Sequence, residues 1–344
     1  MKKPYLSIVL ASRNDDYAGG IHPRVQLCVS SLLEQAERHG LALELILVDW
    51  NPPLGRHPLK EALSWPDHSD FCTVRAIEVP PSIHQRFIFS DKVPLLAHRA
   101  RNVGIRRARG KFIFPTGTDI LFSDALIEFL ASEQLKADRM YRVERYDVPE
   151  DVMQLPSLKA RLDYCEQNVL HIHTQTKRFW IDGLRALHTG AAGDFTLLSR
   201  ELWFKLQGIP EENDFHGFKF DGVLCYMAHA AGAKEEILTT PLRIYHIEHE
   251  ETTWKVKKSW LERMCLRYTP RRFAPKLASL ARRIAPPKSR FDILRVPRIS
   301  GQEYNSLVRD ILEGRRHFVY NDDTWGLAQD KLPESVVVSA KWDN

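Results

Sequence analysis

The sequence has few cysteines and no long apolar run. Its 344 residues include five cysteines, none in a CxxC pair, at Cys28, Cys72, Cys165, Cys225 and Cys265. Such an odd, scattered set excludes a disulfide framework and a zinc knuckle and favours a reducing compartment. No stretch approaches the roughly 18 apolar residues that a membrane span needs. The apolar run Tyr5–Ala11 is also too short for a signal peptide, so we expect a soluble body that opens on a buried strand.

A strong net charge is also lacking, but the charge that is present is unevenly distributed. The whole chain carries a formal +5. The segment Lys255–Arg298 holds fourteen Lys and Arg against two acids, a net +12, which leaves about −7 for the rest. Apolar and aromatic residues are interleaved with these basic residues, a composition typical of a surface that binds anionic lipid or nucleic acid. A solvated helical extension would have the same composition.

Apolar runs alternate with helical patterns over the first 150 residues. The runs Leu6–Ala11, Leu43–Val48, Phe71–Val79 and Lys111–Phe114 indicate strands. Helical patterns lie between or after them, at residues 25–36, 95–109 and 124–135. Strands connected by helices predict an α/β fold with a doubly wound, mostly parallel sheet, and ligands bind such sheets at the carboxyl ends of the strands.

Beyond Tyr146 the pattern becomes less regular. We expect a short extended segment at His171–His173, helices at Ser199–Leu206 and Phe220–Ala231, and a strand at Ile237–Ile247. Composition shifts to the basic tract near residue 250, and a helix is expected later, near Tyr304–Leu312. These changes predict a catalytic domain over residues 1–250 and a basic, mostly helical extension over residues 251–344.

Several segments together resemble the GT-A glycosyltransferases, and more closely the inverting family-two type of bacterial surface-polysaccharide enzymes. Their order and spacing over some 240 residues carry the resemblance. The segments are Leu6–Asn14, Glu44–Asp49, Ala100–Lys111, Phe112–Asp119, Gly193–Phe195, Asp221 and Tyr245–His246. The resemblance implies a GT-A, Rossmann-like fold and transfer of a sugar, with inversion, from a nucleotide-sugar donor that we expect to be a UDP-sugar.

The resemblance also implies a nucleotide pocket at the ends of the first strands. It assigns Asp49 to the nucleobase and places other polar side chains around the nucleotide, namely Ser12, Arg13, Asn14, Arg101, Asn102 and Thr118. The residues alone leave other interpretations open. Asp49 also suits a turn before Asn-Pro-Pro, and Arg101 lies on an Arg-rich helix of which most must be a solvated face.

Asp119 and His246 are the expected ligands of Mn²⁺ or Mg²⁺. A carboxylate that follows a buried strand is a suitable ligand for such cations when they bridge a diphosphate. The family pattern is Asp-x-Asp, whereas this chain reads Gly117-Thr118-Asp119 and lacks the first acid. His246 fits the family's metal-ligating histidine better than His249, for which a polar turn is the expectation. The three-residue spacing of the two histidines excludes a zinc-protease His-Glu-x-x-His helix.

Asp221 is the expected catalytic base. Inverting transfer needs a group that takes the proton of the attacking hydroxyl, and the resemblance places that carboxylate at the start of a helix, as Asp221 is placed. Asp194 is the second catalytic carboxylate, expected on sugar hydroxyls and as the runner-up base. A helix-dipole acid is the alternative interpretation for Asp221. His171 and His173 share one face of an extended segment and stay outside the metal assignment.

The expected partners are a nucleotide-sugar donor and a glycan or lipid-linked acceptor, with no nucleic acid. The basic tract suits an anionic membrane, which predicts a cytoplasmic protein that is peripheral at the inner face of the plasma membrane. Two rivals stay open. A sugar-nucleotidyltransferase would carry a Gly-rich phosphate loop after its first strand, and Ser12–Asp16 has no glycine. A non-catalytic nucleotide-sugar-binding or membrane adaptor is consistent with the missing first Asp.

Overall fold

A computed structural model describes residues 4–174, 186–211, 220–249 and 299–341, together with residues 264, 277, 280 and 296. The basic tract 255–298 therefore lies almost wholly outside the described residues. Within the described part, no helix combines the length and the apolarity needed to cross a membrane.

The centre of the fold is a six-stranded sheet in the order β10-β3-β2-β1-β4-β8. Its four inner strands are parallel: β1 (Leu6–Ser12), β2 (Leu43–Trp50), β3 (Cys72–Val79) and β4 (Phe112–Thr116). The short β8 (Leu198–Ser199) pairs antiparallel with β4. All eight residues of β2 are buried, as expected of an inner parallel strand covered on both faces.

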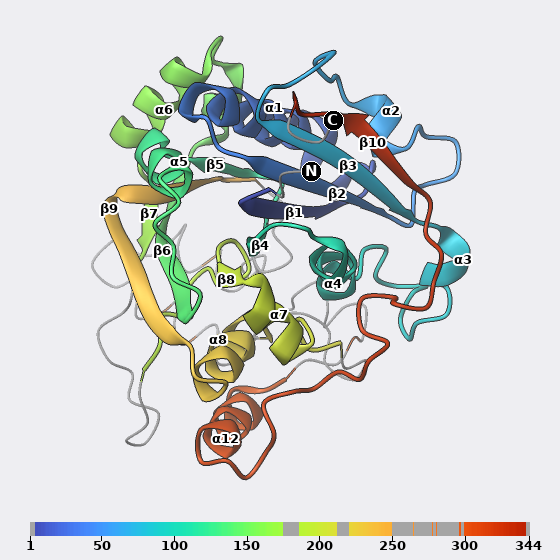
Figure 1. The fold of residues 1–344 in the computed structure, drawn as a ribbon, viewed down its shortest axis with the longest axis vertical. Helices are drawn as coiled ribbons and strands as arrows, with labels where there is room; N and C mark the ends of the chain where they lie inside the picture. Colours follow the sequence, from blue (N-terminus) through green and yellow to red (C-terminus); the bar gives the residue numbers. More distant parts are fainter. Residues whose placement is uncertain are drawn as a thin grey trace.

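Helices cover both faces of this sheet (Figure 1). On one face lie α1 (His22–His39) and α5 (Asp124–Ala131), which pack with the side chains of alternate strand residues such as Leu45 and Leu47. On the other face lie α4 (Ala97–Arg107), α7 (Arg200–Leu206) and α8 (Phe220–Ala230), packed with Ile46 and Val48. The expected doubly wound α/β fold is confirmed. Short helices occur at α2 (Leu59–Ala62), α3 (Pro81–His84), η1 (Tyr17–Gly19) and η2 (Glu150–Gln154).

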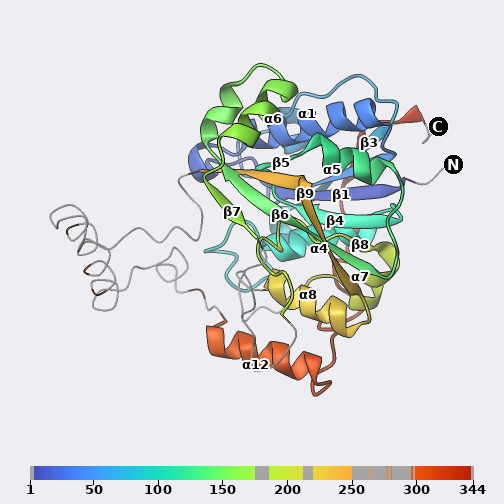
Figure 2. The same ribbon diagram turned by 90° about the vertical axis from the view of Figure 1, so that its left-hand side faces the viewer.

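A second sheet lies beside the first in the order β5-β9-β6-β7 (Figure 2). Its strands are β5 (Ile120–Phe122), β9 (Lys234–Ile247), β6 (Arg139–Val148) and β7 (His171–His173). The helix α6 (Leu158–Gln167) packs on it through Leu158, Leu162 and Cys165. The strand β5 follows directly after β4, so the end of the first sheet runs into the second.

The C-terminal segment returns to the body of the protein. The helix α12 (Gly301–Leu312) packs on α8, and both views show the two side by side (Figures 1 and 2). The strand β10 (Glu334–Val338) adds to the edge of the main sheet, antiparallel to β3. Between them, Asn321 Nδ2 donates to the carbonyl oxygens of Gln207 and Ile209, at 2.8 and 2.7 Å. The chain after residue 299 therefore docks onto the α/β body, and a domain boundary near residue 250 stays a prediction.

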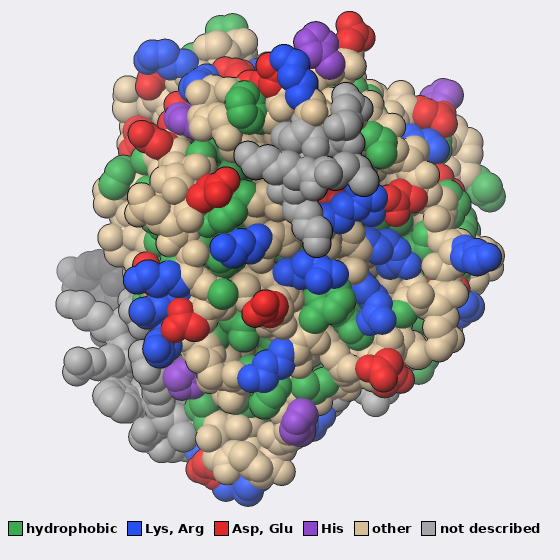
Figure 3. All heavy atoms as spheres, viewed as in Figure 1, with side chains coloured by type: hydrophobic (Ala, Val, Ile, Leu, Met, Phe, Trp, Pro, Cys, Tyr) green, Lys and Arg blue, Asp and Glu red, His purple; other side chains and the backbone are tan. Residues whose placement is uncertain are grey.

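The arginines of α4 do not form the solvated face that their number suggests. Arg107 donates to the carbonyl oxygens of Gly326 and Leu327, at 2.6 and 2.8 Å, and Arg99 pairs with Glu211 at 2.8 Å. Arg106 lies over the ring of Trp325. Figure 3 shows Lys and Arg side chains gathered across the middle of this face, at the level of α4 in Figure 1. The helix thus binds the C-terminal segment through its basic side chains.

Candidate active site

The carboxyl ends of β1, β2 and β4 meet at one edge of the main sheet. The chain runs outward from β1 through β2 to β3 and then returns to place β4 on the other side of β1. Such a reversal opens a crevice between the strand ends, which is where ligands bind in open α/β sheets. Expected site residues lie at these ends: Ser12 is the last residue of β1, Asp49 is the last but one of β2, and Asp119 follows β4 by three residues.

Three of the expected nucleotide residues, Ser12, Arg13 and Asn14, lie at the end of β1 and in the loop after it, on the same edge as Asp49. Ser12 stands opposite Asp49 in the strand register, and both are buried. Arg13 donates to the Asn51 carbonyl at 2.6 Å and to Asp15 at 2.9 Å, which ties the loop after β1 to the loop after β2. Asn14 donates to the His57 carbonyl at 2.9 Å. The loop residues Arg13 and Asn14 are thus held by the chain itself.

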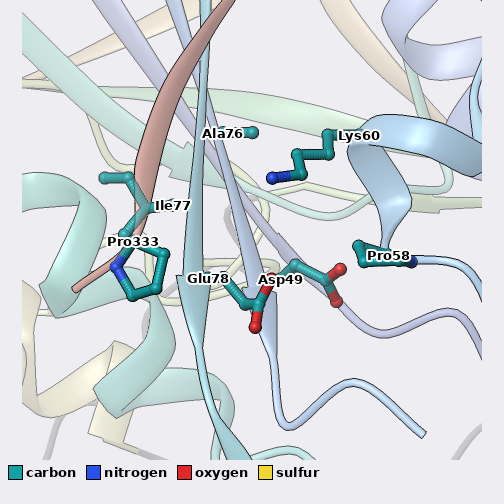
Figure 4. Close-up of a pocket in the computed structure, with 7 residues that line it drawn as sticks. All are labelled: Asp49, Pro58, Lys60, Ala76, Ile77, Glu78 and Pro333. Atoms are coloured by element: carbon teal, nitrogen blue, oxygen red, sulfur yellow. The ribbon is translucent and has the colours of Figure 1, made fainter. Parts of the chain in front are cut away.

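The carboxylate of Asp49 is only half satisfied. One oxygen accepts the amide hydrogen of Leu59 at 2.7 Å, while the other is buried without a hydrogen-bond partner. Burial raises the pKa of Asp49 to about 6, although the Leu59 amide and the nearby Arg13 act against this rise. A pocket beside it is lined by Asp49, Pro58, Lys60, Ala76, Ile77, Glu78 and Pro333 (Figure 4).

The side chains of Asp119, His246 and His249 converge at one place. The Nε2 atoms of His249 and His246 lie 3.0 and 3.5 Å from the same carboxylate oxygen, Oδ2 of Asp119. All three groups are within reach of one metal ion, with ligand atoms within 4.8 Å of one another. Both histidines are buried. His249, for which a polar turn was expected, therefore lies even closer to Asp119 than the expected ligand His246 does.

The strand register explains this convergence. Ile120 in β5 pairs with His246 in β9, so Asp119 reaches the end of β9, and the Ile247 amide donates to the Asp119 carbonyl at 2.9 Å. Burial alone would raise the pKa of Asp119, but the two imidazoles hold it well below its usual range. Burial would lower the pKa of His246, but Asp119 and Asp147 raise it to about 10. Asp119 is thus an anion in contact with both histidines, of which His246 is held in its charged form.

Asp194 and Asp221 lie close to this group, next to two glycines. A Cβ on Gly117 would stand 2.5 Å from Oδ1 of Asp119 and 3.5 Å from Oδ1 of Asp194. A Cβ on Gly193 would stand 2.7 Å from Oδ2 of Asp221. The three carboxylates therefore form one continuous acidic region, in which glycines make the close approach possible.

Both carboxylates have basic neighbours. Arg101 Nη1 and His98 Nδ1 lie 3.4 and 3.6 Å from Oδ1 of Asp221, which is in the first turn of α8. Asp194 accepts from Arg145 at 2.7 Å. Thr116 donates to the Asp194 carbonyl at 2.7 Å, which ties the end of β4 to the loop that carries Asp194. Arg101, which was expected to line the nucleotide pocket, thus lies beside Asp221.

Asn102 and Thr118 differ in their surroundings. The Asn102 amide donates to the Ile209 carbonyl and to Glu211, at 2.7 and 2.8 Å, and accepts from the Ile209 amide at 2.8 Å. These bonds use its side chain to hold the segment around Ile209, so the structure does not bring it into the site. Thr118 is buried next to Asp119.

Two residues of the site escaped the sequence analysis. His249 was weighed and set aside, although it follows the end of β9 by two residues. Asp147 lies in β6, a segment rich in charges that gave no strand pattern, and its Oδ1 is 3.3 Å from His246 Nδ1. The only local signal for this strand was the alternation of Tyr141 and Val143, which is too short to indicate a strand that reaches Asp147.

No model of a known protein family and no curated protein sequence matches the chain. Among solved structures, S. aureus TarS 1–349 in complex with UDP matches with a TM-score of 0.42 and 11% identity, over 89% of this chain and 70% of that one. A longer S. aureus TarS chain gives 0.40 and 10%, over 82% of this chain, which spans only 44% of that one. The catalytic domain of Drosophila β1,4-galactosyltransferase 7 in complex with xylobiose gives 0.34 and 11%, over 71% of each. At such scores these matches carry no inference about activity.

Proposed function

We propose that the chain is an inverting GT-A-type glycosyltransferase of the family-two kind, which moves a sugar from a nucleotide-sugar donor to a hydroxyl acceptor. One observation carries the proposal. Asp119, which follows β4 by three residues, forms one group of possible metal ligands with His246 and His249, and nucleotide ligands are expected at this edge of the main sheet. The resemblance stated above favours a UDP-sugar as donor.

The donor's nucleotide end would lie toward Asp49. The unpartnered buried oxygen of Asp49 offers an acceptor to a nucleobase N–H. Ser12 ends β1, Arg13 and Asn14 lie in the loop that follows it, and Thr118 is buried next to Asp119. Asn102 would contribute indirectly, by holding the segment around Ile209.

The side chains at Asp119 fit a divalent cation. They offer one carboxylate oxygen and two imidazole nitrogens, and these atoms lie within 4.8 Å of one another. Asp119, His246 and His249 would hold the ion. A bound Mn²⁺ or Mg²⁺ would neutralise charge on the departing diphosphate. Two imidazoles favour Mn²⁺ over Mg²⁺, since Mg²⁺ prefers an all-oxygen shell.

Asp221 would act as the base. Its carboxylate takes the proton of the acceptor hydroxyl as the hydroxyl oxygen bonds to the anomeric carbon, and the bond from that carbon to the diphosphate oxygen breaks. Arg101, 3.4 Å away, holds the carboxylate in place. Asp194 would bind a sugar hydroxyl, with Arg145 fixing its orientation.

The acceptor would be a glycan or a lipid-linked glycan, and the protein would work in the cytoplasm at the inner face of the plasma membrane. The +12 charge of Lys255–Arg298 supports this proposal, because juxtamembrane basic clusters bind anionic lipid. Cosedimentation with phosphatidylglycerol vesicles and with phosphatidylcholine vesicles tests it. Binding only to the anionic vesicles, lost when Arg271, Arg272, Arg282 and Arg283 become Gln, is expected. Equal binding to both kinds of vesicle would contradict it.

The function is tested by incubating the full-length protein with UDP-, GDP-, CMP- and dTDP-sugars plus Mn²⁺. Thermal stabilisation and slow nucleotide release with one UDP-sugar are expected. No nucleotide binding from any donor would overturn the proposal.

A variant pair then tests the base. Asp221→Asn should lower transfer by about 10²–10⁴-fold, the usual contribution of a general base, while donor affinity stays within about twofold. Glu201→Gln is the matched control, since Glu201 also lies in the first turn of a helix and is exposed. Loss of donor binding by a folded Asp221→Asn protein would make Asp221 a ligand instead of the base.

A further inference from the structure

We propose that Asp147 is a positioning residue that sets the orientation and tautomer of His246 for metal binding. The inference rests on the proposed metal-assisted transfer. It adds a residue that the sequence analysis did not identify and that lies on the far side of His246 from Asp119.

The register of the second sheet places the two side chains side by side. Asp147 in β6 is the direct partner of His246 in β9. Nδ1 of His246 lies 3.3 Å from Oδ1 of Asp147, while Nε2 lies 3.5 Å from Oδ2 of Asp119. The two ring nitrogens thus face different carboxylates. A proton on Nδ1, directed at Asp147, leaves the Nε2 lone pair for the metal ion.

Asp147 is itself fixed from two sides. Arg145 Nε lies 3.0 Å from Oδ1 of Asp147, and His173 Nε2 lies 3.0 Å from Oδ2. Asp147 is only 4% exposed, so the position of its carboxylate is set by these neighbours. The guanidinium of Arg145 also donates to Asp194 at 2.7 Å. One arginine therefore connects the carboxylate behind His246 to a carboxylate of the acidic region.

The same residues could suggest a second metal site. Asp147, His246 and Glu248 also have ligand atoms within 4.8 Å of one another. The Arg145 guanidinium, however, already lies against Asp147, so a second cation would face a fixed positive charge 3.0 Å from its ligand. It would also have to share His246 with the first ion. A carboxylate that supports the metal-binding histidine is the arrangement that fits all the contacts.

Outer carboxylates of this kind change metal affinity by about 10–100-fold. The test is calorimetric titration of Mn²⁺ into the metal-free full-length protein. The wild type should bind one Mn²⁺ per chain. Asp147→Asn should bind it about 10–100-fold more weakly, and Asp147→Glu should recover part of the loss. Binding of UDP without metal should stay unchanged in both variants, which a general loss of folding would not allow.

Two further variants complete the test. Glu144→Gln is the matched control, because Glu144 lies on the same strand and its carboxylate accepts from Tyr146. Wild-type affinity in Asp147→Asn, as in Glu144→Gln, would overturn the inference. Two Mn²⁺ ions in the wild type, falling to one in both Asp147→Asn and Glu248→Gln, would overturn it in favour of a second metal site. A wild type that binds no Mn²⁺ would overturn it together with the metal step, while the donor assay decides on transfer separately.

Discussion

Gly193 lies directly against the carboxylate of Asp221. A Cβ at this position would stand 2.7 Å from Oδ2 of Asp221 and 3.2 Å from Nη1 of Arg101. Any side chain here must therefore displace the proposed base or the arginine beside it.

Gly193→Ala is expected to lower the rate of transfer by about tenfold or more, since misplacement of a catalytic group by about 1 Å costs up to 10²-fold. The measurement is kcat with the best donor, with the thermal midpoint recorded alongside. Gly190→Ala in the same loop is the control, because its Cβ would meet the ring of His188 at 3.3 Å and the Thr174 carbonyl oxygen at 3.7 Å, but no catalytic carboxylate. Equal loss in both variants would show a general disturbance of the loop and not a displaced base.

The two histidines at Asp119 should contribute to one metal site. His249→Gln and His246→Gln are each expected to weaken Mn²⁺ binding by at least tenfold, since each removes one of three protein ligands. Transfer by the wild type should be faster with Mn²⁺ than with Mg²⁺. His22→Gln is the control, because His22 contacts the Ala62 carbonyl outside this group. Unchanged Mn²⁺ affinity in His249→Gln would limit the site to Asp119 and His246.

The inner strands and the helices between them could be predicted from the sequence because apolar residues occupy most of their buried positions. β1, β2 and β4 are mostly apolar, and Gly40 ends α1 in the left-handed conformation. Asp49 lies near the end of such a strand and Asp119 shortly after one, so their place at the edge of the sheet also followed from the pattern.

β6 and β10 could not be predicted, for different reasons. Arg142, Arg145 and Asp147 face buried partners from β6, and charged residues on inward positions break the alternation that reveals a strand. β10 is a short edge strand whose partner β3 lies about 260 positions earlier in the chain, a pairing with no local signal. His249 joins Asp119 only through the register of β5 and β9. The part of the site that lies on the second sheet could therefore not be predicted from the sequence.

Asp49 should oppose stability and support donor binding at the same time. Its pKa is about 6 in the folded protein, against 3.8 for the ordinary carboxyl, so the folded state holds the proton more tightly. Its ionisation therefore destabilises the fold as pH rises through this window, by at most about 3 kcal/mol, and the penalty is absent below the unfolded-state pKa.

Asp49→Asn is expected to raise the free energy of unfolding at pH 8 by about 1–3 kcal/mol, with the gain vanishing near pH 4. Urea unfolding at both pH values measures this. The Asn oxygen can still accept from the Leu59 amide, so the hydrogen bond between β2 and the start of α2 is retained. Donor affinity should fall by about tenfold, since the charged acceptor for the nucleobase is lost. A variant that is less stable at pH 8 would contradict the argument from burial.

The C-terminal helix α12 should influence transfer through Tyr304. The hydroxyl of this residue hydrogen-bonds the side chain of Thr189, just before the loop that carries Asp194. It also fills the place where a Gly222 side chain would be, 2.8 Å from that Cβ, next to Asp221. Burial raises the pKa of Tyr304 above its usual range, so its hydroxyl stays neutral.

Tyr304→Phe keeps the ring and removes the hydroxyl. It should cost about 0.5–1.5 kcal/mol of unfolding free energy, because a buried hydrogen bond is lost, and should also lower kcat several-fold. Tyr5→Phe is the matched control, since the Tyr5 hydroxyl accepts from the Leu135 amide at 3.1 Å near the amino ends of the strands. It should lose similar stability with kcat unchanged. If Tyr304→Phe also left kcat unchanged, α12 would be bound to the catalytic body without affecting the loop that carries Asp194.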